Sequence, residues 1–233
     1  MVTDPDETRR LFLLRALAAG LFAASPLARS DLLGKVPHKL PAGQSIYSLK
    51  GELRINGQPV NADTLITSND KLATGPGGQA IFVVGKDAFL LRENSELQLS
   101  GDNLLVGGLR LLTGALLSVF GKSRHQVETP LATIGIRGTG LYVESQPDLS
   151  YVCTCYGTTV IGPVIGAGAN PDNTETITSQ HHDAPRYVSA DGRIHPASFV
   201  NHTDEELMLI ETLVGRTPPF ALIDDGYGGP KRY

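Results

Sequence analysis

The sequence predicts a mainly β protein, an elongated β-roll or sandwich of many short strands, with a C-terminal extension that carries one α-helix. Turn-forming residues are plentiful, since the chain of 233 residues has 26 glycines and 15 prolines and only 6% aromatic residues. Short apolar or alternating segments follow one another with a turn signal roughly every 6 to 12 residues, which is typical of all-β folds. A helix signal is clear only near the C-terminus, at 203–214.

The composition is that of a globular protein, with 41% hydrophobic and 19% charged residues. A chain of this length can bury a sizeable core. The formal net charge is −4 and no basic patch stands out, so nucleic acid is not an expected partner.

Residues 1–30 are typical of an export signal of the twin-arginine type. Arg9 and Arg10 precede an apolar run at 16–24, and small residues follow it. This run is too short for a transmembrane helix, which needs about 20 apolar residues, but it suits a secretory signal. We therefore expect a periplasmic protein of a Gram-negative bacterium, with no membrane span in the mature chain. The alternative is a basic amphipathic helix in the cytosol.

Residues 42–161 form the predicted β domain. Asn56-Gly57 is a strong hairpin signal because both residues tolerate positive φ. The continuous apolar run Gln79–Val84 predicts a strand buried on both faces. We expect about a dozen strands, none of them long, with turns at Gly107-Gly108 and at Gly114. The open edges of such a sheet could accept a strand from a protein partner, unless loops cap them.

A second notable stretch runs from Val127 to Val143 and contains Thr129-Pro130 and Arg137-Gly138-Thr139. Proline removes a ladder hydrogen bond, so Pro130 predicts a strand start or edge. An arginine between glycines either binds the carbonyls of a neighbouring turn or reaches an anion. We expect the first role for Arg137, in which case its replacement by alanine would destabilise the domain by about 2–3 kcal/mol.

These residues resemble the signature of the FecR family of periplasmic domains. Two upstream segments, GELRING at 51–57 and NDKLATGPGG at 69–78, resemble the family's opening hairpin and a later turn, with Asn69 where glycine is usual. The resemblance covers 44–161. It implies an all-β signalling domain that binds a protein partner and has no known catalytic residues. Sensor members also have a cytoplasmic anti-sigma domain, for which the segment before Ala16 leaves no room, so we expect a free-standing exported member.

The two cysteines, Cys153 and Cys155, follow a strand signal and are two residues apart, so their side chains should share one face. Downstream stand His181 and His182, and farther on His202. Two thiolates and two imidazoles form the ligand set of a closed tetrahedral zinc site, and sulfur ligands also suit copper. We therefore predict a metal site at Cys153, Cys155, His181 and His182, with His202 as a substitute for one imidazole.

Three alternatives stay open at this point. The cysteines could form a disulfide or a redox-active pair, although a bridge between residues i and i+2 is strained. They could be two buried thiols that act as small hydrophobic residues. The least supported alternative is a thiol enzyme that uses one cysteine with His181 and Asp183.

Residues 162–233 form the predicted extension. A long loop comes first, and Asp191-Gly192 then predicts a second hairpin. Thr203 and Glu206 form a capping box that starts a helix over about 204–214. This helix has an apolar face that either packs on the core or binds a partner, formed by Leu207, Ile210, Leu213 and Val214.

Overall fold

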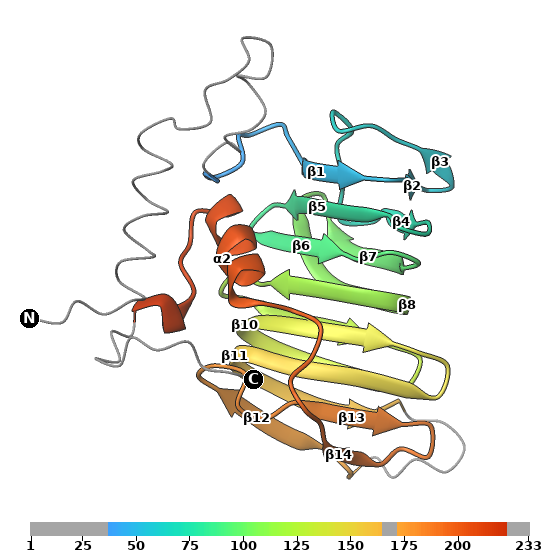
Figure 1. The fold of residues 1–233 in the computed structure, drawn as a ribbon, viewed down its shortest axis with the longest axis vertical. Helices are drawn as coiled ribbons and strands as arrows, with labels where there is room; N and C mark the ends of the chain where they lie inside the picture. Colours follow the sequence, from blue (N-terminus) through green and yellow to red (C-terminus); the bar gives the residue numbers. More distant parts are fainter. Residues whose placement is uncertain (1–36, 165–171, 223–233) are drawn as a thin grey trace, which may run out of the picture. The chain divides into compact units, whose positions relative to one another are not determined.

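The computed structural model describes residues 37–164 and 172–222 (Figure 1). The predicted export signal lies outside these residues, as does the C-terminal tail. The described part is mostly β, with one 14-stranded sheet and a single α-helix near its C-terminal end, which confirms the predicted fold class.

The sheet has one main path and several side pairings. Its order is β14-β13-β11-β10-β9-β8-β7-β4-β2-β3; β12 also pairs with β11, β1 with β5, β5 with β6, and β6 with β8. The bounds are β1 Ile46–Lys50, β2 Leu53–Ile55, β3 Gln58–Pro59, β4 Lys71–Thr74, β5 Gln79–Val84, β6 Asp87–Leu91, β7 Glu96–Asp102, β8 Leu105–Val119, β9 Arg124–Glu128, β10 Ala132–Ser145, β11 Leu149–Pro163, β12 Glu175–Ser179, β13 Arg186–Ser189 and β14 Ile194–Pro196.

Three of the strands are much longer than predicted. β8 and β11 have 15 residues each and β10 has 14. Gly107, Gly108 and Gly114 lie inside β8 and do not end it, so the expected turns there are wrong. Gly114 has φ +84 and closely follows the register shift between β7 and β8, which lies at Leu112. A bulge of this kind bends a strand without ending it, which lets β8 pair first with β7 and β9 and then with β6 and β10.

Where β5, β6, β8 and β10 lie together, the strands are buried on both faces because they contribute to two hydrophobic layers. Phe82, Phe89 and Leu141 belong to the inner layer, whereas Leu90 and Tyr142, on the opposite face, belong to the outer layer. This arrangement confirms that the run Gln79–Val84 is buried on both faces. Helix α2 (Asp204–Leu213) covers the outer layer against β6 and β8 (Figure 1).

The predicted local signals at the hairpins and the helix are confirmed. Asn56 and Gly57 both have positive φ between β2 and β3, and Gly192 does so between β13 and β14. Thr203 is the N-cap of α2, and its capping box with Glu206 is complete. A short 3-10 helix, η1 (Pro219–Leu222), follows α2.

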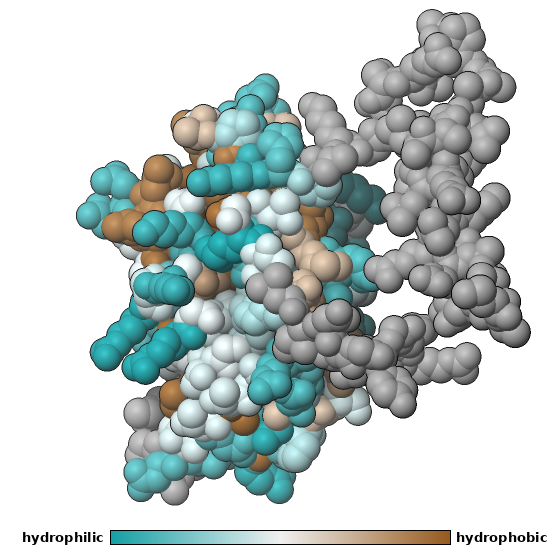
Figure 2. Space-filling model, turned by 90° about the vertical axis from the view of Figure 1, so that its left-hand side faces the viewer, coloured by the Kyte–Doolittle hydropathy of each residue, from teal (hydrophilic) through white to brown (hydrophobic). Residues whose placement is uncertain are grey.

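Three free edges of the sheet, at β3, β14 and β1, are short or irregular, whereas β12 pairs in regular register with β11 alone. β3 ends at Pro59, β14 ends at Pro196, and β1 has a register shift after Ile46. Proline and bulges discourage strand addition at an edge. On the face shown in Figure 2, hydrophobic side chains form small separate groups among hydrophilic ones. Within the described ranges, no helix is long and apolar enough to cross a membrane.

Candidate metal centre

Strand β11 brings the two cysteines together. Cys153 and Cys155 are both fully buried in the outer layer, on one face of the strand as their spacing predicts. Both are free cysteines in this structure.

A turn after β12 places His182 over these cysteines. The Asp183 carboxylate accepts hydrogen bonds from the backbone N–H groups of Gln180 (2.7 Å) and His181 (3.2 Å), which closes the turn. His182 has φ +55, and its own N–H donates to the Cys155 carbonyl at 2.9 Å. The Nδ1 of His182 faces the thiols, whereas the neighbouring ring of His181, 4.9 Å away, contacts Asp204.

The start of helix α2 supplies the second imidazole. His202 stands directly before the N-cap Thr203, and Asn201 before it has φ +61. The ring of His202 is buried and stacks on Tyr142 with centroids 4.4 Å apart.

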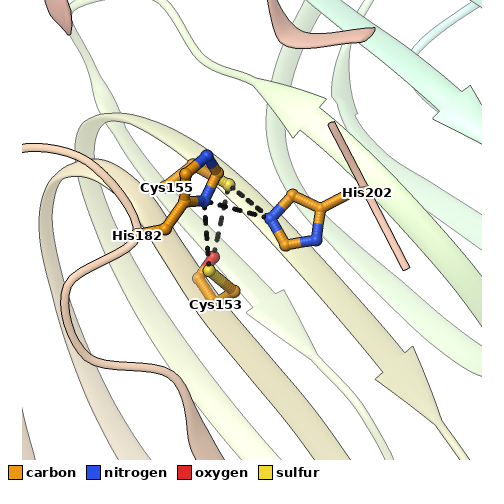
Figure 3. Close-up of side chains that lie close together, drawn as sticks. All are labelled: Cys153, Cys155, His182 and His202. Carbon is orange, nitrogen blue, oxygen red and sulfur yellow. Dashed lines mark hydrogen bonds between the residues drawn. The ribbon is translucent and has the colours of Figure 1, made fainter. Parts of the chain in front are cut away.

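Four donor atoms converge from these elements (Figure 3). Cys153 Sγ lies 3.5 Å from His182 Nδ1, Cys155 Sγ lies 3.4 Å from His202 Nε2, and the two nitrogens are 3.2 Å apart. All four atoms lie within 4.8 Å of one another. A tetrahedral zinc ion with ordinary bond lengths would place nitrogens about 3.3 Å apart and a nitrogen and a sulfur about 3.6 Å apart. The observed separations are close to the edges of such a tetrahedron.

Outer hydrogen bonds orient both imidazoles with a lone pair toward this space. His202 Nδ1 donates to the carbonyl of Val200 at 2.7 Å, which leaves Nε2 as the free acceptor. His182 Nε2 donates to Asp204 Oδ1 at 3.1 Å, which leaves Nδ1 free. Carbonyl and carboxylate partners of this kind are usual behind metal-bound histidines. Two lone pairs facing each other at 3.2 Å repel, so a cation or a proton between them is stabilising.

The electrostatics of the cluster favour an anionic sulfur. Hydrogen-bond contact with Cys155, followed by contact with His182 and His202, lowers the pKa of Cys153 well below its ordinary value despite burial. Burial, together with Cys153, raises the pKa of Cys155. Burial also acts to lower the pKa of His182, but Cys153 and Asp204 outweigh it and raise that pKa overall. A thiolate is the form of cysteine that binds metals.

His181, predicted as a ligand, does not face the thiols. Its Nε2 lies 2.9 Å from both oxygens of Asp204, the carboxylate that also contacts His182. The structure thus places His202 in the position that the sequence assigned first to His181. The enzyme alternative with His181 and Asp183 is not assembled either, because the carboxylate of Asp183 closes the turn at 179–183.

The signature residues around β10 divide into structural and exposed groups. The Thr129 hydroxyl accepts the N–H of Ala132 at 2.8 Å, which stabilises the turn at Pro130 just before β10. Thr139 is buried and its hydroxyl bonds the carbonyl of Arg137 at 3.0 Å. Gly138 has φ +56, so it occupies a conformation that favours glycine.

Arg137 corrects the sequence-based expectation. Its side chain is exposed, and within the described ranges it forms no hydrogen bond or ion pair with a carbonyl or carboxylate. The structure therefore does not support a buried, carbonyl-binding role for Arg137, and it gives no basis for a loss of about 2–3 kcal/mol on replacement.

Sequence reasoning missed Asp204 as the residue that holds His182. The only available signal was the tripeptide His202-Thr203-Asp204 at the predicted helix start. It places a carboxylate directly after the cap and a histidine directly before it.

Comparisons with protein-family models and with curated proteins found no match. Among solved structures, the chain is similar to two crystal structures of a "putative anti-sigma factor" from Parabacteroides distasonis. The identity is 11% in both cases, with TM-scores of 0.45 and 0.44. The likeness covers 55% of this chain and 58% of the length of those chains. The FecR resemblance stays a prediction from the sequence motifs.

Proposed function

We propose that this chain is a non-enzymatic, zinc-binding module of the FecR-like kind, which works in the periplasm through a protein partner. The proposal rests first on the four donor atoms of Cys153, Cys155, His182 and His202. Their separations are close to those of a tetrahedral ion, and the second nitrogen of each imidazole is already hydrogen-bonded.

Zinc suits this arrangement better than copper does. A tetrahedral set of two sulfurs and two nitrogens is typical of zinc. All four ligand residues are buried, so the ion would have no open position for water. Closed sites of this kind are structural, whereas catalytic zinc sites keep one position for water or substrate.

In this proposal the ion ties the C-terminal extension to the sheet. Its ligands come from β11, from the turn after β12 and from the residue before the cap of α2. Since a structural zinc site contributes folding free energy, α2 and the turn stay docked in the zinc-bound form. The surface offered to a partner by the extension would then depend on the metal.

Elemental analysis of the purified full chain, with a thiol count before and after chelation, tests the zinc site. We expect one zinc per chain and two thiols that react with an alkylating agent only after a chelator is added. The variant Cys153→Ser/Cys155→Ser should lose the zinc, whereas His195→Ala, at an exposed histidine of β14, should keep it. A chain without metal and without free thiols would overturn the proposal in favour of a disulfide.

One observation favours a second candidate, a thiol nucleophile. Cys153, His182 and Asp204 are linked by contacts of 3.5 Å and 3.1 Å in the order of a thiol, imidazole and carboxylate triad. Against it, Cys153 is 0% exposed and His202 also faces the same imidazole nitrogen. Fast alkylation of a single cysteine in the folded, metal-free protein would favour this candidate.

The periplasmic location rests on residues 1–30 and has its own test. Replacement of Arg9 and Arg10 by lysine should retain the protein in the cytoplasm if the twin-arginine route is used. Such a route exports folded proteins, so the zinc would be bound before export and would protect the thiols in the oxidising compartment. Unchanged export of the variant would contradict this route.

A further inference from the structure

Two arginines lie side by side on the exposed face of β9 and β10. Arg124 and Arg137 are directly opposite each other in the antiparallel pair of β9 and β10, and both are exposed. Directly opposite residues in such a pair have Cβ atoms about 5 Å apart, and like charges at this distance repel. Within the described ranges, no carboxylate forms an ion pair with either guanidinium.

The row of side chains continues with hydroxyl groups. Thr158 of β11 is the partner of Arg137, and Thr178 of β12 is the partner of Thr158. The two threonine hydroxyls are 3.1 Å apart. Four adjacent strands thus present two cations and two hydroxyls in one line, which spans about 14 Å.

The backbone that carries this row is fixed from behind. The buried Thr139 hydroxyl lies 3.0 Å from the carbonyl of Arg137 and 3.1 Å from that of Thr158. The left-handed Gly138 lies in the bulge just after Arg137. Bulges often redirect a side chain next to a functional site. The Arg-Gly-Thr signature thus presents an arginine on a rigid support.

A surface groove of about 590 Å³ adjoins the row and is lined by both arginines, Thr158 and Gln126. Gly135 forms part of its lining, and a Cβ built there would meet only Val160, at 3.9 Å. The nearest acid along β9 is Glu128, four residues beyond Arg124, where it accepts a hydrogen bond from Gln126 at 2.7 Å. One end of the groove therefore carries the positive charge of the two arginines, and the part of the lining around Gly135 is uncharged.

We propose that Arg124 and Arg137 bind a phosphate group, the charged end of a ligand whose uncharged part lies in the groove. A phosphomonoester carries about −1.5 to −2 charges at neutral pH, which matches two guanidinium groups better than a carboxylate does. Arginine binds phosphate oxygens in a bidentate manner, and the threonine hydroxyls can donate to the remaining oxygens. The site is independent of the zinc proposal, since none of the metal ligands lines the groove.

The test is titration calorimetry of the zinc-loaded full chain with inorganic phosphate and with glucose 6-phosphate, at low salt. The variants Arg124→Gln and Arg137→Gln should each weaken binding about tenfold, the effect of losing hydrogen bonds to a charged group. Arg110→Gln is the matched control, because Arg110 is exposed on the neighbouring strand β8 but does not line this groove. It should bind like the unmodified protein.

A second variant separates the groove from the charges. Gly135→Val keeps both guanidinium groups, suits a strand and fills the groove. It should weaken the binding of glucose 6-phosphate more than that of inorganic phosphate.

Vesicles of phosphatidylcholine with and without phosphatidylglycerol distinguish a lipid headgroup from a free phosphate, since binding to the anionic vesicles alone would assign the site to lipid. Absence of binding to every probe, or equal weakening in Arg110→Gln, would overturn the proposal.

Discussion

Replacement of His202 by alanine is the most direct way to test the candidate metal centre. The expected size of the effect follows from the ligand count. Structural zinc sites bind with on the order of 12 kcal/mol, so one ligand of four contributes about 3 kcal/mol, or about 150-fold in affinity. His202 also occupies a fully enclosed position, at 3% exposure, so no neighbouring side chain can replace it without repacking Tyr142.

The structure further predicts a graded series for the neighbours of the site. Asp204→Ala removes the partner of His182 and should weaken zinc binding by about 10- to 100-fold. His181→Ala removes only a second contact of that carboxylate and should weaken zinc binding by less than about tenfold. His195→Ala, on the exposed side of β14, should have no effect.

Competition with a chromophoric zinc chelator measures all four variants on one scale. Thermal unfolding in excess chelator provides the control, because it compares the metal-free variants with metal-free unmodified protein and reveals any general misfolding. The reasoning would be refuted if His181→Ala lost as much affinity as predicted for His202→Ala while His202→Ala bound zinc normally.

Three further predictions concern the fold. Leu207→Ala, at a fully buried position of α2, should lower the free energy of unfolding by about 2–5 kcal/mol in urea titrations, and a loss below about 1 kcal/mol would show that α2 does not depend on this packing. Thr203→Ala should cost about 1 kcal/mol through loss of the helix cap, measured in chelator to remove the effect of the metal. Arg137→Gln should change the free energy of unfolding by less than about 0.5 kcal/mol, because its side chain is exposed; a larger loss would restore a structural role.

Local signals in the sequence predicted much of the fold. Positive φ at Asn56, Gly57 and Gly192 determines the two hairpins, and the capping box at Thr203 determines the start of α2. These features depend on a few neighbouring residues, so a sequence contains them in full.

Features that depend on the partners of a strand were not predictable in the same way. A glycine such as Gly114 ends a strand in one context and continues it beside a bulge in another, and the outcome depends on which strand lies next to it. Along β8 the neighbouring strands change from β7 and β9 to β6 and β10, and the bulge accommodates this change. The exposure of Arg137 follows from the register of β10, in which Ile134 and Ile136 face the core and Arg137 alternates with them.

The candidate site shows the same division between local and distant information. Spacing alone placed Cys153 and Cys155 on one face, because the strand period of two is local. The choice between His181 and His202 depended on the turn closed by Asp183, and on the position of α2 over β6 and β8. Neither is visible in a pattern of cysteines and histidines.

The helix cap and the metal site share one tripeptide, which explains how residues so far apart in sequence can meet accurately. Thr203 has the extended conformation of an N-cap (φ −133, ψ 162), whereas Asp204 already belongs to the helix. This change of direction sends the flanking side chains to different sides of the cluster. His202 reaches the sulfur of Cys155, and Asp204 reaches the far nitrogen of His182. The capping box that the sequence predicts therefore also orients one ligand and the partner of another, so loss of the cap should weaken the metal site as well as the helix.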